Sequence, residues 1–464
     1  MSKVVRPSRF LPSIVPVAIA CVLSYTPLAQ SQGAKQVNAL TSIPDSGRDH
    51  IKERNEWFYR GRVVHGFPSA ELRGRAYQSK VNLRKQRAAS LMQSPSQTSF
   101  SIGSWIPLGP VPLASDASGN GTQDYHQVAG RASAVAVDPA DSSGNTVFVG
   151  GAQAGIWKST NAAASNANTV TWNPISDDQA TLSIGAIAIQ PGNSDPNKTV
   201  ILAATGEANN SADSYFGLGI LRSTNGGSSW SLVNSANNGA LSFSGLGGTR
   251  MAFSSAPNQT NTVVSAMAIS SEGVIDGIVN SGTTRGLYTS LNAGQSWTYN
   301  ALVDPGGATD ESSATSVVYN AAAGLFFAVI RYHGFYSSPD GVNWTRLANQ
   351  PGGAVLSTSA CPPQSASNNY SCPIYRGEIT AVPTRNEMYV WYVYVNAYGA
   401  TVDGGIWQSV NGGASWTSIS ENGITNCGDI LGCGIEQGTY DLALLAVPNG
   451  GATDLYAEYR LTLP

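Results

Sequence analysis

Charged residues are scarce in this chain of 464 residues: Asp, Glu, Lys and Arg make up 12% of it, about half the usual share. A mainly helical protein would carry more Glu and Lys on its exposed faces, so the shortage argues against a helical fold. Glycine is abundant instead, with 50 residues, and glycine with small polar residues suits tight turns between short strands. We therefore expect an all-β protein.

Histidine is also rare, and His50, His65, His126 and His333 are scattered along the chain. None of them forms a metal-binding spacing with the cysteines, so we expect no metal site and no cofactor. A phosphate-binding glycine loop and a Gly-x-Ser-x-Gly nucleophile elbow are missing as well. The sequence offers no motif for nucleotide chemistry or for serine hydrolysis.

No apolar run is long enough to span a bilayer. Residues 14–23 are apolar, follow a basic start and precede small residues at positions 29–31. This order is typical of a secretory signal peptide, so we expect residues 1–31 to be removed. The mature protein is then secreted or periplasmic and has no membrane span. A membrane anchor is the alternative, and Pro12 and Pro16 count against it.

Cysteine is limited to five residues, and Cys21 lies within the predicted signal peptide. The other four form two close pairs, Cys361 with Cys372 and Cys427 with Cys433. An even number of cysteines in an exported chain indicates disulfides, and we expect both pairs to be bridged. Four free buried thiols are the alternative.

The few charges are distributed unevenly. Residues 48–87 contain eleven Lys and Arg against four Asp and Glu, whereas residues 88–464 contain eleven against 24. We predict a leader and basic helical segment over residues 32–100, with a break at Pro68 and a second helix over 70–91. Because an export signal precedes it, we expect this segment to dock on the acidic body rather than to bind nucleic acid.

Short alternating strands recur from residue 101 onward. Each of about six units opens with two apolar strands, as in residues 134–137 and 147–149, and its third strand begins with glycine, as in residues 155–159. Five units close with a turn and a tryptophan, namely Trp172, Trp230, Trp297, Trp344 and Trp416. Four antiparallel strands per repeat describe one blade of a β-propeller. The sequence therefore predicts a propeller over residues 101–464.

The turn before three of the tryptophans has a fixed pattern of residues. Its positions are Ser223, Asn225, Gly227 and Trp230; Ser290, Asn292, Gly294 and Trp297; and Ser409, Asn411, Gly413 and Trp416. The pattern resembles the Asp-box, or BNR repeat, Ser-x-Asp-x-Gly-x-x-Trp, of sialidases, sortilin-type receptors and xyloglucanase-like glycoside hydrolases, with Asn here in place of Asp. The resemblance implies a β-propeller whose turns lie on the outer rim. There Asn bonds its own backbone, Gly supplies a positive φ and Trp packs under the hairpin, so these residues are structural.

The last unit stops at Pro464 after its second strand. Residues 104–109 could supply one further strand to it, where two are needed. Relative to the family that it resembles, the chain therefore looks C-terminally shortened, and whether its ring closes stays open.

The resemblance leaves two functions open, and the first is a scaffold that binds a glycan or an extracellular protein. Arg131, Arg250 and Arg376 stand at the starts of opening strands, which line the central channel of a propeller. Three such arginines could clamp an anionic ligand. The alternative role for each of these arginines is to pair with a nearby backbone carbonyl or an acid such as Glu378.

The second function is a glycoside hydrolase, sialidase-like or xyloglucanase-like, that uses paired carboxylates in the central funnel. Candidate carboxylates near strand ends are Glu207, Asp213, Glu378 and Asp441. The Phe/Tyr-Arg-Ile/Leu-Pro stretch that sialidases show before their first box is missing. A ring without all its strands would also hold catalytic groups poorly, so we favour binding over hydrolysis.

Overall fold

The structure is a computed structural model that describes residues 69–93, 113–114, 127–128, 130–209, 214–269, 284–302, 312–357, 372–396, 401–419, 438–440 and 442–458. The chain divides into two compact units, one of residues 1–7, 58–99 and 130–464 and the other of residues 8–57 and 100–129. The described part of the smaller unit is an antiparallel pair, β1 (Leu113–Ala114) with β2 (Gln127–Val128). Within the described residues, no helix has the length and apolar character needed to cross a membrane.

The described part of the larger unit begins with a long helix, α2 (Ser69–Gln93). It covers the predicted second helix, and Arg84, Lys85 and Arg87 are exposed on it. The predicted signal peptide, the helical stretch before Pro68 and the strand at residues 104–109 lie outside the described residues.

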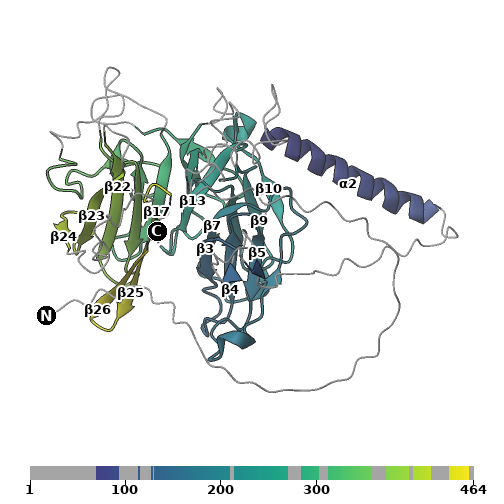
Figure 1. Cartoon of the computed structure of the whole chain (residues 1–464), viewed down its shortest axis with the longest axis horizontal. Coiled ribbons are helices and arrows are strands. Elements are labelled where there is room, and N and C mark those ends of the chain that lie inside the picture. The colour runs from purple at the N-terminus through teal and green to yellow at the C-terminus, as the bar shows by residue number, and fades with distance from the viewer. Residues whose placement is uncertain are drawn as a thin grey trace, which may run out of the picture. The chain divides into compact units, whose positions relative to one another are not determined.

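Five four-stranded antiparallel sheets follow, each with its strands paired in chain order (Figure 1). Blade 1 comprises β3 (Ala132–Val137), β4 (Val147–Gly151), β5 (Gly155–Ser159) and β6 (Asn173–Pro174). Blade 2 comprises β7 (Ile184–Ile189), β8 (Ile201–Thr205), β9 (Ile220–Ser223) and β10 (Ser231–Val233). Blade 3 comprises β13 (Leu246–Phe253), β14 (Val263–Ile269), β15 (Gly286–Ser290) and β16 (Thr298–Asn300).

Blade 4 comprises β17 (Ala314–Asn320), β18 (Leu325–Ile330), β19 (Gly334–Ser338) and β20 (Thr345–Arg346), and blade 5 comprises β21 (Arg376–Ala381), β22 (Met388–Val395), β23 (Thr401–Ser409) and β24 (Thr417–Ser418). In the sixth unit the described strands are β25 (Ala443–Asn449) and β26 (Ala452–Glu458). Smaller elements are β11 (Ser235–Ala236), β12 (Leu241–Ser242) and the 3₁₀ turns η1 (Ala167–Thr169), η2 (Pro196–Lys198) and η3 (Asn237–Gly239). The prediction of an all-β propeller with four-stranded antiparallel blades is confirmed.

The apolar core lies between the blades. The innermost strands of successive units contact one another, from β3 and β7 through to β21 and β25. Strand β22 shows how one sheet serves two interfaces: Tyr389 and Trp391 pack toward the sixth unit, whereas Val390 and Tyr392 pack toward blade 4. The alternation along this aromatic strand therefore builds core on both faces, as the sequence pattern predicts.

A one-residue register shift lies within the first four residues of the innermost strand in blades 1 to 4, at Ser133, Gly185, Thr249 and Thr315. The Thr249 hydroxyl donates to the Ala314 carbonyl at 2.9 Å, which links blade 3 to blade 4. At Gly185 a side chain has no room, because a Cβ there would lie 1.9 Å from the Gly248 carbonyl oxygen. The residues at these β-bulges thus form close contacts between the innermost strands of adjacent blades.

The three regular turns share one hydrogen-bond pattern. The Ser223 hydroxyl accepts from the Gly227 N–H at 2.9 Å, and Asn225 Oδ1 accepts from the Ser229 N–H at 2.9 Å. Equivalent bonds recur in the turns 290–297 and 409–416. Gly227 has φ +89°, a conformation that favours glycine. Each turn connects the third strand of its blade to the outer strand, and its tryptophan precedes that outer strand by one residue.

The disulfide prediction falls mostly outside the described residues. Cys372 is buried and disulfide-bonded. Cys361, Cys427 and Cys433 are not described, so the predicted pairing stays a prediction.

Candidate binding site at the mouth of the central channel

The innermost strands of the described blades all begin at the same end of the sheets, which is called the mouth below. Arg131 directly precedes β3, Arg250 lies in β13 and Arg376 is the first residue of β21. The connection after β8 begins at this mouth as well and carries Glu207. The three arginines and two of the four candidate carboxylates therefore come together.

Arg131 connects three parts of the ring. Its guanidinium forms an ion pair with Glu207, from blade 2, and donates a hydrogen bond to the hydroxyl of Tyr440, which precedes the sixth unit. The same guanidinium lies 5.2 Å from the centre of the Tyr440 ring. Glu207 is only 1% exposed, so the pairing compensates a charge that burial would otherwise make costly.

Glu378 is shared by two arginines from different blades. Its carboxylate lies 3.1 Å from the Arg250 guanidinium and 3.3 Å from that of Arg376. Arg376 also donates to Asn209 Oδ1 at 3.3 Å and to the Leu442 carbonyl at 3.2 Å. The Arg250 side chain remains 33% exposed, against 13% for Arg376. Both arginines thus form the ion pairs that the sequence analysis gives as their alternative role, and the Arg250 side chain is the more exposed of the two.

Two further arginines belong to this mouth and were missed from the sequence. Arg331 directly follows β18, and Arg285 directly precedes β15. Burial lowers the pKa of the Arg331 guanidinium, and the positive charges of Arg376 and Arg285 lower it further, against the opposing effect of Tyr375 and Tyr332. The signal that could have found them is positional, because both border strands at the end where the innermost strands begin.

The mouth is therefore positively charged within the described part of the chain. Five arginines from four blades lie at this end of the strands, and three of them pair with two carboxylates, Glu207 and Glu378. These five make up nearly half of the eleven Lys and Arg residues in an otherwise acidic stretch, residues 88–464, with 24 Asp and Glu. A site with an excess of one charge attracts ligands of the opposite charge.

The same geometry bears on hydrolysis. A glycosidase needs one carboxyl group that is protonated and one that faces the sugar. Glu207 and Glu378 are both buried and both paired with arginine, so neither is presented in that way. Asp213 and Asp441 lie outside the described residues. Among the residues that are described, no group of His, Cys, Asp and Glu could hold a metal ion.

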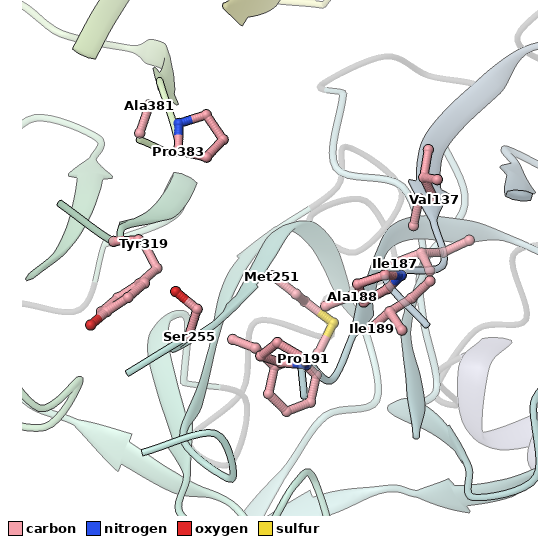
Figure 2. Close-up of a pocket in the computed structure, with 14 residues that line it drawn as sticks. Val137, Ile187, Ala188, Ile189, Pro191, Met251, Ser255, Tyr319, Ala381 and Pro383 are labelled. Atoms are coloured by element: carbon pink, nitrogen blue, oxygen red, sulfur yellow. The ribbon is translucent and has the colours of Figure 1, made fainter. Parts of the chain in front are cut away.

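The opposite end of the innermost strands has a different character. An apolar pocket of about 390 Å³ lies there, with Val137, Ile189, Met251 and Pro383 from four blades in its lining (Figure 2). None of its 14 lining residues is charged. The channel thus has a cationic mouth and an apolar mouth, and the candidate polar site lies at the former.

Fold and site together define the class of this chain, which is a β-propeller scaffold. No protein-family model matches it, and no curated protein matches it at the level of sequence. Solved structures do resemble it in fold. An ancestral GH74 enzyme is 18% identical, with 69% of this chain and 33% of the enzyme covered and a TM-score of 0.42. The chain thus spans about one third of the length of that enzyme.

Two other solved structures extend the comparison. YCF48 from Cyanidioschyzon merolae is 13% identical, with 62% of this chain and 85% of YCF48 covered and a TM-score of 0.31. Sqt1 of Saccharomyces cerevisiae is 11% identical, with 71% and 70% covered and a TM-score of 0.37. At such identities the similarity concerns the fold alone.

Proposed function

We propose that this protein is an exported binding propeller whose arginine-lined mouth takes an anionic group of a glycan or an extracellular protein. The observation that carries the proposal is the gathering of five arginines, three of them paired with two carboxylates, at one end of the strands in a body that is otherwise acidic. Arg250 has the most exposed side chain of the three arginines in ion pairs at the mouth, and the planar donors of a guanidinium match carboxylate and sulfate oxygens.

The architecture supports a binding role. The ion pairs and bulges fix the arginines on a rigid frame of packed blades, so little ordering is required when a ligand binds. The turns with the pattern Ser-x-Asn-x-Gly-x-x-Trp resemble Asp-box repeats and lie away from this mouth, between third and outer strands. Export is proposed from the signal-like N-terminus, and the disulfide-bonded Cys372 supports it, because disulfides persist in oxidising compartments.

A glycoside hydrolase is the second candidate, since Glu207 and Glu378 lie at the same mouth. Their pairing with arginine counts against it. Hydrolysis would be recognised as turnover of fluorogenic sialosides or β-glucans that Glu207→Gln and Glu378→Gln abolish. We expect no such turnover.

Binding is tested by titrating the mature protein with polygalacturonate, heparin, polyglutamate and neutral xyloglucan at low salt. We expect an anionic polymer to bind and xyloglucan not to bind. We expect Arg250→Gln to weaken the affinity for the anionic polymer about fivefold or more. Lys198→Gln is the control, because Lys198 is 79% exposed, in the turn between β7 and β8 at the other end of the strands. Equal affinity of Arg250→Gln and the unmodified protein would refute the proposed site.

A further inference from the structure

A pair of tyrosine rings stands beside the arginines of the cationic mouth. Tyr332 and Tyr375 lie 6.0 Å apart, edge to face at 77°. Tyr332 has φ +62°, a conformation that side chains with a Cβ rarely adopt. Its N–H donates to the Ile374 carbonyl at 2.8 Å and its carbonyl accepts from the Cys372 N–H at 3.3 Å, so the fold holds the strained turn in place. Strain of this kind in a fixed turn is commonly associated with functional sites.

Arg331 lies against this aromatic pair. Its guanidinium is 4.1 Å from the centre of the Tyr375 ring, and its Nε donates to the Tyr375 carbonyl at 3.0 Å. Neither Arg331 nor Arg285 forms an ion pair with a carboxylate of the described residues, whereas Arg131, Arg250 and Arg376 all do. Arg285, directly before β15, and Arg331, directly after β18, border neighbouring blades at the same end of the strands, and the charge of Arg285 lowers the pKa of Arg331. Two arginines from neighbouring blades therefore bring positive charge to the aromatic pair.

We infer that Arg285, Arg331, Tyr332 and Tyr375 form a second subsite next to Arg250 and Arg376, and that it takes an acidic sugar residue of a polysaccharide. This inference rests on the proposed function and specifies its ligand. Ring faces stack on the C–H faces of pyranoses, and guanidinium groups bind the carboxylates that such sugars carry. An acidic peptide would match the arginines alone. A polymer with one negative charge on each sugar also fits arginines that are spread over several blades.

The test is a calorimetric titration of the mature protein and its variants with oligogalacturonate of defined length. The double variant Arg285→Gln/Arg331→Gln should weaken binding about tenfold. Its matched control is Arg84→Gln/Arg87→Gln, which removes the same charge from exposed positions on α2. Equal weakening of binding by the two double variants would mean that only the net charge of the protein matters, and would overturn the subsite.

The tyrosine contribution is tested separately. Tyr332→Gly removes the ring and suits the positive φ, so we expect folding to be retained and affinity to fall severalfold. Tyr332→Phe retains the ring face and should bind within about twofold of the unmodified protein. If the double arginine variant does not fold, Arg285→Gln alone replaces it, and the expected loss is then about threefold.

The outcomes separate this inference from the proposed function. If Arg250→Gln weakens binding while Arg285→Gln/Arg331→Gln and Tyr332→Gly do not, the subsite is refuted and the anion site stands. If sulfated heparin or polyglutamate binds more tightly than galacturonate oligomers, the carboxylate-bearing sugar is the wrong ligand class. If no anionic polymer binds, both proposals fail.

Discussion

The Arg131 guanidinium lies 5.2 Å from the centre of the Tyr440 ring and donates a hydrogen bond to its hydroxyl. Arg131 precedes the first blade and Tyr440 precedes the sixth unit, so this contact joins the two ends of the described blades. Arg376, the first residue of blade 5, donates hydrogen bonds to the carbonyls of Tyr440 and Leu442. The start of the sixth unit is therefore held from both sides at the cationic mouth. Farther along the strands, Val135 of β3 and Leu445 of β25 are exposed, so the polar contacts at the mouth hold this part of the ring.

The first prediction concerns that contact. Tyr440→Ala removes the ring and the hydroxyl and should lower the free energy of unfolding by about 1–3 kcal/mol. Tyr440→Phe keeps the cation–π contact and should lose only about 1 kcal/mol. Urea denaturation measures both. An unchanged midpoint for Tyr440→Ala would show that Arg131 does not fasten the sixth unit.

The second prediction concerns pH. Burial raises the pKa of Glu387, but hydrogen bonds from Tyr389, Thr453 and Gln408 and the charge of Arg385 outweigh burial and hold that pKa below its usual 4.5. A carboxyl group whose pKa is lowered on folding stabilises the folded state above its ordinary pKa and loses this contribution as the pH falls through the folded value. Thr453 belongs to β26, so acid should loosen the sixth unit from blade 5.

Thermal unfolding from pH 7 down to pH 3 tests this prediction. The unmodified protein should lose stability below about pH 4.5. Glu387→Gln should be less stable at pH 7 and should show a shallower loss toward acid. If Glu387→Gln lost stability toward acid as steeply as the unmodified protein, other carboxylates would cause the acid sensitivity and the prediction would be wrong.

The third prediction concerns the close approach of blades 2 and 3. Gly185→Ala would place a Cβ 1.9 Å from the Gly248 carbonyl oxygen, where only the backbone can yield. We expect a loss of about 3 kcal/mol or more, or failure to fold. Gly74→Ala is the control, because no heavy atom lies within 4 Å of the added Cβ in α2, and it should not lower the unfolding temperature.

The fourth prediction separates the turns from the binding site. Asn292→Ala removes the acceptor of the Ser296 N–H bond of 2.9 Å and should cost about 1 kcal/mol. Asn292→Asp keeps that acceptor and should be nearly neutral. Neither variant should change affinity for an anionic polymer. A loss of binding with retained stability would place the outer turns in the ligand site.

The sequence supports prediction of the blades because alternation with a period of two shows which residues of a strand share a face. Tyr389 and Trp391 are therefore assigned correctly to one interface by the alternation alone. The meeting of Arg131 and Arg376 also follows, since both stand where innermost strands begin, whereas Arg250 lies in the middle of β13 and reaches them through Glu378. Periodicity does not reveal which acidic residue of one blade meets an arginine of another. The sharing of Glu378 by Arg250 and Arg376 can therefore be seen only in the structure.

Arg285 and Arg331 were missed for a related reason. They border the second and third strands rather than the innermost ones, and their approach to the mouth depends on how far each sheet extends toward the channel. The bulges at Thr249 and Thr315 are also invisible to the pattern, because one extra residue at the start of a strand leaves the rest of the alternation unchanged.

The central claim is that the mouth binds anions through arginines and does not use Glu378 as a catalytic carboxylate. It is tested most directly by one set of polygalacturonate binding isotherms for the unmodified protein, Arg250→Gln and Glu378→Gln. We predict that Arg250→Gln weakens binding about fivefold or more, whereas Glu378→Gln, which removes a competing negative charge, leaves binding equal or tighter. Unchanged affinity in Arg250→Gln, together with lost affinity in Glu378→Gln, would contradict the account.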